Sequence, residues 1–169
     1  SHPGEPHRVT YIITPPSLVM PNDLPSMRAL AAWMTRNHEQ GAILCSVCAG
    51  AFVLAETGLF EGREVTTHWA FDESLSSRFP DAKVDADRII VDEGDIITAG
   101  GILAWTDLGL TLVQRLLDAS AMLQTARFLL IDPPRQAQRP YISFIPKLDH
   151  GDAPIRSAQH WLQTHATAE

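Results

Sequence analysis

The residue best placed to do chemistry is Cys48, in the segment Ser46-Val47-Cys48-Ala49-Gly50. Small residues lie two positions before and two positions after the thiol. A sharp strand-to-helix turn requires them, because its central residue takes a strained backbone conformation. The helix that follows points unpaired N–H groups at the sulfur, which favours the thiolate over the thiol. The pattern predicts a nucleophile-elbow cysteine at position 48, with Ala49 and Gly50 beginning the helix.

The second cysteine, Cys45, does not fit the same turn, because its flanking residues would be Ile43 and Val47. We therefore expect Cys45 in the strand. Two other interpretations exist: Cys48 as a small buried hydrophobic residue, and the C-x-x-C spacing as a redox pair or half a zinc site. A structural zinc site needs four ligands, and no second Cys or His pair has suitable spacing, so we expect no metal. A thioredoxin-like motif would place both cysteines at the helix start.

A second glycine-rich turn follows a predicted strand at Thr98-Ala99-Gly100-Gly101. Ligands collect at the carboxyl ends of parallel strands, where helix N-termini can hold anions. We expect this turn and the Cys48 turn to face one crevice, although Gly100 and Gly101 could simply permit a tight turn. Asp107, farther along the predicted helix, could cap a neighbouring loop or reach the pocket. The aromatic residues Trp69 and Trp105 could form a pocket wall, but core packing is the safer interpretation.

These residues depend on an alternation of predicted strands and helices, which indicates an α/β layered fold with a mainly parallel sheet flanked by helices. The expected strands cover 8–14, 41–47, 63–67, 83–84, 88–91 and 95–98. The expected helices cover 24–38, the segment from Cys48 to Gly58, 69–79, the segment from Gly100 to about Leu117, 121–131 and 153–165.

Composition favours one globular domain, since 45% of the 169 residues are hydrophobic and 20% are charged. A formal net charge of -7 argues against nucleic-acid binding by this segment itself. The longest apolar stretch, 41–55, is shorter than the roughly 20 residues that span a bilayer, and no secretory leader is visible. Two closely spaced cysteines cannot staple a fold, which favours the cytoplasm. We expect no cofactor and no membrane contact, and a Pro-rich linker at 132–141.

The segment from Ser46 to Trp69 resembles the nucleophile-elbow region of the class I glutamine amidotransferase-like superfamily, in its PfpI-type branch. Within that branch it most resembles the N-terminal domain of AraC-type transcriptional regulators, most closely from Gly41 to Leu116. The resemblance implies a flavodoxin-like fold and a sensor domain at 1–131, without the first strand and helices of the family. An acidic side chain from that leading segment commonly contacts the thiol, and none can be named here. Residues 132–169 resemble the linker and first helix before a helix-turn-helix DNA-binding domain that is absent from this chain.

The same resemblance places His68 near Cys48. A neutral imidazole there could accept the thiol proton, and an imidazolium could stabilise the thiolate. His68 could equally be a hydrogen-bonded structural residue at a strand end. Asp72 and Glu73 could orient His68, or they are solvated acids in the first turn of a helix. The remaining histidines have no expected role: they are His2, His7, His38, His150, His160 and His165.

Two functions follow from the resemblance. The favoured one is a ligand-sensing and oligomerising domain of a bacterial AraC-type regulator, a homodimer that binds a small-molecule effector and reaches DNA through a domain outside this chain. Its expected ligand-binding residues are Cys48, Ala49, Gly50, His68, Trp69, Gly100 and Gly101. The alternative is a cysteine-dependent hydrolase or hydratase acting on an amide or isonitrile, with Cys48 and His68 catalytic. We favour the sensor over the enzyme, because a catalytic thiol usually needs several aligned partners.

Overall fold

The structure, a computed structural model, describes residues 9–17, 27–133, 135–142 and 151–165. Its strands are β1 (Tyr11–Thr14), β2 (Ile43–Val47), β3 (Glu64–Val65), β4 (Lys83–Val84), β5 (Ile90–Asp92) and β6 (Ile96–Ala99). Its α-helices are α1 (Arg28–Glu39), α2 (Gly50–Ala55), α3 (Asp72–Arg78), α4 (Trp105–Leu116), α5 (Ala119–Leu129) and α6 (Ala153–His165). Short 3₁₀ helices lie at Trp69–Phe71, Ile102–Ala104 and Arg139–Tyr141.

The main sheet has the strand order β1-β2-β6-β5. Strands β1, β2 and β6 are parallel, and β5 runs antiparallel to β6 at the edge. The antiparallel pair follows from the short connection between β5 and β6, which turns through Gly94 at a φ of 94°. Only a hairpin can close over so few residues, since parallel neighbours need a long crossover. Strands β3 and β4 form a separate parallel pair. The predicted mainly parallel α/β sheet is confirmed.

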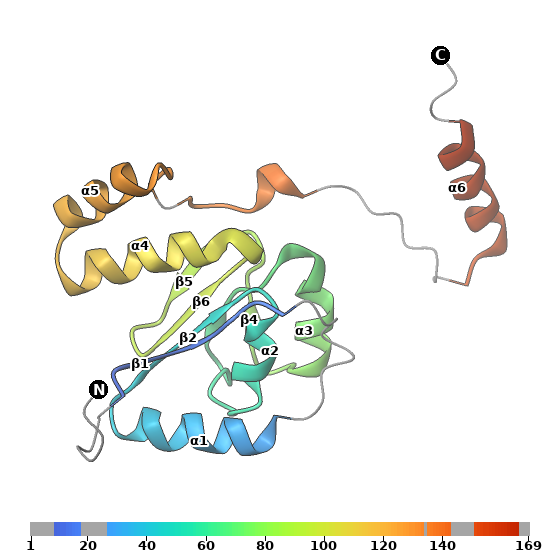
Figure 1. The fold of residues 1–169 in the computed structure, drawn as a ribbon. Helices are drawn as coiled ribbons and strands as arrows, with labels where there is room; N and C mark the ends of the chain where they lie inside the picture. Colours follow the sequence, from blue (N-terminus) through green and yellow to red (C-terminus); the bar gives the residue numbers. More distant parts are fainter. Residues whose placement is uncertain (1–8, 18–26, 134, 143–150, 166–169) are drawn as a thin grey trace.

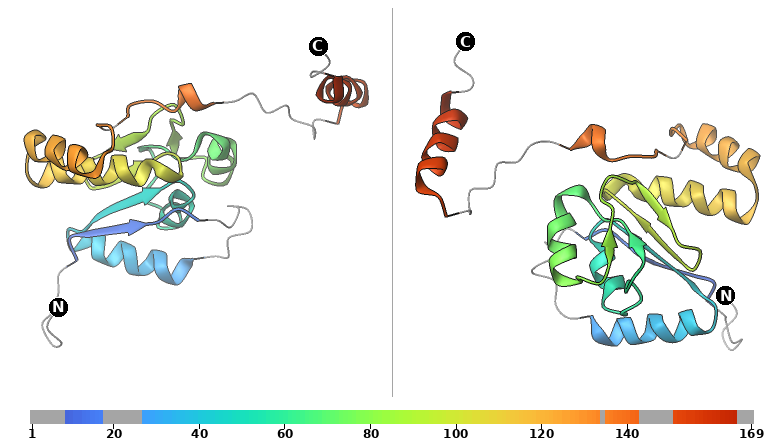
Figure 2. Two further views of the ribbon diagram at one scale, coloured as in Figure 1. Left: turned by 45° about the horizontal axis from the view of Figure 1, so that its top comes forward. Right: turned by 180° about the vertical axis from the view of Figure 1, so that it is seen from behind.

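Helices cover both faces of the sheet (Figures 1 and 2). Strand β2 shows why: Leu44 belongs to a buried cluster with Met34 of α1 and Phe52 of α2, whereas Cys45 belongs to one with Leu108 of α4. Successive side chains of a strand point to opposite faces, so β2 is apolar on both sides. The flavodoxin-like layering therefore rests on the continuous apolar run that the sequence shows.

Helix α5 packs against α4, where Leu110, Met122 and Ala126 form a small buried cluster. The side chain of Asp118 accepts the N–H of Ala121 at 2.7 Å and begins α5. Helix α6 has the predicted bounds and lies apart from the sheet in both views (Figures 1 and 2). None of the helices in the described parts of the chain is long and apolar enough to cross a bilayer.

Several predicted bounds differ from the structure. The predicted helix at 69–79 is divided into the 3₁₀ helix Trp69–Phe71 and α3, and the predicted strand at 63–67 is reduced to β3. The predicted starts at residues 8 and 24 lie outside the described residues.

Residues 135–142, which we call the strap, lie along residues 87–89 although composition predicts a linker there. The N–H of Ile89 donates to the carbonyl of Gln136 at 3.1 Å, and Arg88 forms an antiparallel bridge with Ala137. The domain boundary at 131 stays a prediction. The strap nonetheless completes one side of the site described next.

Candidate functional site

Cys48 occupies the turn between β2 and α2 with a φ of 53°. A non-glycine residue in this left-handed region costs about 1–2 kcal/mol. The turn is held from two sides: the Cys48 N–H donates to the Ala99 carbonyl at 2.8 Å, and the Cys48 carbonyl accepts from the Thr67 hydroxyl at 3.0 Å. The predicted turn geometry is therefore present at Cys48, and a nucleophilic role for the thiol stays a prediction.

Gly50 begins α2 at a close approach to the neighbouring strand. A Cβ at this position would lie 2.7 Å from the carbonyl oxygen of Pro15, just beyond β1. The hydroxyl of Thr14 also donates to the Gly50 carbonyl at 3.0 Å. A small residue is thus required here by the end of β1 as well as by the sharp turn that the sequence predicts.

The Cys48 side chain is buried, with 1% of its surface exposed. It belongs to an apolar cluster that includes Ile89, Ala104 and Leu108. Burial raises the pKa of the Cys48 thiol, and the backbone hydrogen bond at Ala49 offsets this only in part. This shift runs against the expected preference for the thiolate, because desolvation outweighs the field of a helix of only six residues.

Cys45 lies inside β2, as expected, and is fully buried. Burial raises the pKa of its thiol to about 12, with a smaller contribution from the carboxylate of Asp92. Both cysteines are free thiols. The described residues contain no group of three or more His, Cys, Asp or Glu side chains that could hold a metal ion.

His68 precedes the 3₁₀ helix Trp69–Phe71 as its N-cap. Its Nδ1 accepts the backbone N–H of Ala70 at 3.1 Å, so the neutral imidazole carries its proton on Nε2. The ring lies 5.2 Å from the Trp69 ring and 5.4 Å from the Phe71 ring, measured between centroids. Burial lowers the pKa of His68. The imidazole is therefore a neutral, fixed side chain whose free nitrogen donates and does not accept.

His68 is linked to the Cys48 turn through its neighbour in the chain, Thr67. The Thr67 hydroxyl donates a hydrogen bond to the Cys48 carbonyl. Asp72 and Glu73 lie in the first turn of α3, where acids stabilise the helix N-terminus. The Asp72 carboxylate accepts from the Ser76 hydroxyl at 3.3 Å. This arrangement fits the helix-terminus interpretation of the two acids better than an orienting role toward His68.

A cavity of about 210 Å³ lies beside His68. Its lining residues come from four segments: residues 68–69 before α3, Ile89 before β5, the β6–α4 turn, and the strap. They are His68, Trp69, Ile89, Gly101, Ile102, Leu103, Ala104, Arg135, Gln138 and Tyr141. The structure thus brings together three of the predicted ligand-binding residues. The other four, Cys48, Ala49, Gly50 and Gly100, are not among the lining residues.

The cavity and the Cys48 turn nevertheless share neighbours. Ile89 and Ala104 line the cavity and also belong to the buried cluster of Cys48. Access from the cavity to the thiol would therefore require these side chains to move.

Three lining residues that sequence reasoning missed come from the strap: Arg135, Gln138 and Tyr141. Asp107, which is 3% exposed, accepts from the Arg135 backbone N–H at 2.7 Å and from its Nη2 at 2.7 Å. The hydrogen bond to Asp107 raises the pKa of Arg135, whose guanidinium also lies 5.7 Å from the centroid of the Tyr141 ring. Of the two roles open to Asp107, the structure supports the capping of a neighbouring segment. The signal available in the sequence was an acidic residue among the apolar residues of a predicted helix.

One other expectation is wrong, and one residue without an expected role makes a structural contact. Trp105 is 55% exposed and does not pack in the core, because it lies on the outer side of the first turn of α4. His38 was given no role, but its Nε2 lies 2.7 Å from Asp95, which also binds Arg63 through both carboxylate oxygens. The hydrogen bond from Arg63 lowers the pKa of Asp95 to about 2.

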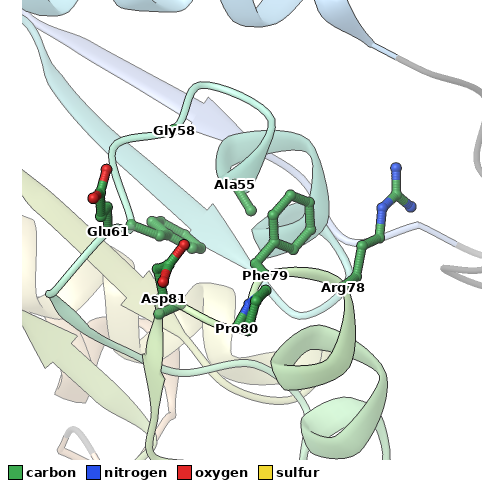
Figure 3. A pocket seen from close by; sticks show the side chains of 9 residues that line it. Ala55, Gly58, Glu61, Arg78, Phe79, Pro80 and Asp81 are labelled. Carbon is green, nitrogen blue, oxygen red and sulfur yellow. The ribbon is translucent and has the colours of Figure 1, made fainter.

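A second cavity, of about 200 Å³, lies between the end of α2 and the end of α3 (Figure 3). Ala55, Phe60 and Phe79 contribute apolar surface, and Glu61 and Asp81 contribute carboxylates. None of the predicted site residues lines it.

Comparison with known proteins decides the family. The profile of the DJ-1/PfpI family matches residues 11–115, which is more than half of the chain. The chain belongs to the DJ-1/PfpI family. Its relatives include the isonitrile hydratase of Pseudomonas putida, 42% identical over 77 residues, which cover 46% of this chain and 32% of the relative. They also include the HTH-type transcriptional regulator CdhR of Pseudomonas aeruginosa, 34% identical over 85 residues, which cover 50% of this chain and 25% of the relative.

Solved structures agree with this DJ-1/PfpI fold. An AraC family transcriptional regulator from Pseudomonas putida matches with a TM-score of 0.56 at 21% identity, covering 63% of this chain and 58% of that one. Drosophila melanogaster DJ-1beta matches with a TM-score of 0.60 at 20% identity, covering 72% of this chain and 64% of that one. Identities this low show the fold alone. The chain spans about a third or less of the length of the hydratase and the regulator named above.

Proposed function

We propose that this DJ-1/PfpI domain is the ligand-sensing and oligomerising part of a bacterial, cytoplasmic AraC-type transcriptional regulator, with a small molecule bound in the cavity beside His68. The observation that carries the proposal is that one cavity is lined both by the domain and by the strap. Arg135, Gln138 and Tyr141 approach from the strap, and His68 and Trp69 from the domain. A molecule in this cavity would contact both parts at once. The transcriptional regulators among the relatives support the same conclusion.

The lining of the cavity indicates what kind of molecule it accepts. Trp69, Tyr141 and Leu103 offer apolar and aromatic surface, and the Arg135 guanidinium adds a charged, polar group. Small-molecule sites typically combine a mostly apolar wall with a few polar groups that fix orientation. We infer a compact, partly polar effector. The predicted contributions of Cys48, Ala49, Gly50 and Gly100 are then indirect, since these residues shape the turns behind the wall.

In this proposal the effector changes the arrangement of a homodimer, and DNA is contacted by a helix-turn-helix region outside these 169 residues. The chain's net charge of -7 agrees with a domain that does not itself bind phosphates.

A cysteine-dependent hydratase is the second candidate, and the 42% identity to isonitrile hydratase is the observation that favours it. Cys48 would be the nucleophile and His68 the proton carrier. The geometry opposes this assignment in two ways. The thiol is buried, which raises its pKa, and the Nδ1 lone pair of His68 is already used by the Ala70 N–H. Both groups would have to rearrange before any reaction.

The sensor is tested by thermal-shift screening of amines, amides and amino acids. A ligand that binds only the folded state stabilises it by about 2.7 kcal/mol at one hundred times its Kd. We expect at least one compound to raise the melting temperature of the native protein and to lose this effect in Trp69→Ala. Trp161→Ala, in the exposed helix α6, should retain it. A shift that survives Trp69→Ala would place the site elsewhere.

The enzyme is tested by the pH dependence of Cys48 alkylation with iodoacetamide, in a Cys45→Ala background. Because burial raises the thiol pKa, we expect slow reaction at neutral pH and an increase only above about pH 9. The Cys48→Ala protein gives the background rate. A reactive thiolate at pH 7 would favour the hydratase over the sensor.

A further inference from the structure

Gln138 is the most deeply buried residue of the strap, with 2% of its surface exposed. Its Nε2 donates to the carbonyls of Thr67 at 2.8 Å and Arg88 at 2.9 Å, and its Oε1 accepts the N–H of Trp69 at 3.0 Å. A carboxamide has two donor hydrogens and one carbonyl acceptor. Both ends of the Gln138 amide are thus used, and the partners lie on the two sides of His68 in the chain.

The opposite wall is shaped to receive this amide. A Cβ at Gly100 would lie 2.6 Å from the Cδ of Gln138. The amide could not move aside without losing the hydrogen bonds that hold it in a buried position, where an unpaired polar group is costly. Gly100 therefore has a role beyond a tight turn: its missing side chain leaves the space that Gln138 fills.

The backbone of the strap reinforces the same placement. The Gln138 N–H donates to the Asp87 carbonyl at 2.5 Å, and the Asp87 carboxylate pairs with Arg139 at 3.0 Å. Gln138 is also linked to the Cys48 turn. The Thr67 carbonyl accepts from Gln138, and the Thr67 hydroxyl donates to the Cys48 carbonyl. One side chain of the strap thus contacts the backbone that carries His68, and through it the strained turn.

We propose that Gln138 is the positioning residue of the cavity: its amide fixes the backbone on both sides of His68, so that the docked strap orders the His68 and Trp69 wall. This inference rests on the proposed function only in treating the cavity as the ligand site. The positioning itself is a property of the protein without ligand. It is therefore measured separately from the thermal-shift screen, and either can fail without the other.

The test compares Gln138→Ala with Gln136→Ala in the full 169-residue chain. Gln136 is the same residue type in the same strap, but its side chain is exposed. Amide hydrogen exchange is followed at Trp69, whose N–H binds Gln138, and at Leu44 in the core strand β2. We expect Gln138→Ala to exchange at least tenfold faster at Trp69 with no change at Leu44, and Gln136→Ala to match the native protein at both.

A second measurement separates positioning of His68 by Gln138 from a general loss of stability. The His68 imidazole is titrated by NMR in the same variants. Because burial lowers the pKa of His68, release of its segment should move this pKa back toward its ordinary value in Gln138→Ala alone. The charged group that shares the cavity, Arg135, is paired with Asp107, and neither residue is changed in these variants.

Gly100→Ala supplies an independent perturbation from the opposite wall. It should reproduce the Trp69 exchange and the His68 shift, since its Cβ occupies the space of the Gln138 amide. In the double variant Gly100→Ala, Gln138→Ala, the amide that the new Cβ would clash with is gone. The changes in Trp69 exchange and in the His68 pKa should therefore be much smaller than the sum of those in the two single variants. The proposal is overturned if Gln138→Ala behaves like Gln136→Ala, if exchange at Leu44 rises together with Trp69, or if the double variant is fully additive.

Discussion

A single added methyl group should have opposite effects at two helical glycines, Gly50 and Gly109. Gly109 lies inside α4, where alanine is intrinsically favoured over glycine by about 1 kcal/mol. Gly50 is the first residue of α2, where at most the same gain applies. At Gly109 a Cβ would meet nothing within 4 Å. We therefore expect Gly109→Ala to stabilise the protein by up to about 1 kcal/mol, through helix propensity and the lower entropy of the unfolded chain.

At Gly50 the same change meets backbone. The new Cβ would lie 2.7 Å from the carbonyl oxygen of Pro15 and 2.9 Å from the carbonyl carbon of Thr14. These atoms cannot rotate away as a side chain could, because Thr14 ends β1, which is paired with β2. Overpacking a core typically costs about 1–3 kcal/mol, and a backbone obstacle places this site at the upper end. After the gain in helix propensity, a net loss of about 2 kcal/mol remains.

The assay is urea unfolding at pH 7, followed by far-ultraviolet circular dichroism, with melting temperature as a second measure. For a protein of this size about 2–4 °C corresponds to 1 kcal/mol, so Gly50→Ala should melt about 4–8 °C below the native protein. Gly109→Ala should melt slightly above it. Equal or greater stability of Gly50→Ala would refute the close approach of α2 to β1, and with it the geometry assigned to the Cys48 turn.

Two further predictions concern charged residues. Asp107→Ala should destabilise the protein by about 2 kcal/mol in the same urea assay: loss of one partner from a buried pair costs about 3–5 kcal/mol, reduced here because the Arg135 side chain is 33% exposed. Asp92→Ala, which removes the more exposed pair between β5 and Arg115 of α4, should cost less than about 1 kcal/mol, and equal losses would contradict the burial argument. The folded-state pKa of Asp95 is about 2, below its unfolded value of 3.8, so its contribution to stability is present above about pH 4 and is lost as the pH falls toward 2. Asp95→Asn should flatten unfolding free energy against pH in that window, whereas an unchanged slope would show that Arg63 does not hold the carboxylate.

The sequence predicted most of the fold because its signals are local. The apolar run before Cys48 and the small residues around it specify a buried strand and a sharp turn, and both are present. The edge strand β5 and the separate pair β3–β4 depend on which strands meet, which periodicity does not encode. The predicted helix at 69–79 begins instead as a 3₁₀ helix capped by the His68 side chain, a contact that only the folded chain reveals.

The site was predicted less well, and for a physical reason. The sequence shows the helix whose field favours a Cys48 thiolate. It does not show the desolvation that raises the thiol pKa, because desolvation depends on tertiary neighbours such as Ile89 and Leu108. The strap was missed because its proline-rich composition indicates a linker, and nothing local shows that Gln138 is buried. The glycine pair at 100–101 was the available signal, but a missing Cβ does not name the side chain that fills its place.

Strap and cavity together also decide how a sensor of this kind could respond. If a molecule binds only where Arg135, Gln138 and Tyr141 are docked, it must favour the docked strap by its difference in affinity for the two forms. Gln138 and the Asp107–Arg135 pair already hold the strap in the docked form. Only the small undocked population is then left for a ligand to convert. A nearly complete reversal of a two-state equilibrium needs about a 10⁴-fold difference in affinity. A weak effector could therefore act only on a strap that is already partly undocked, which makes the exchange rate at Trp69 without ligand the quantity that limits the response.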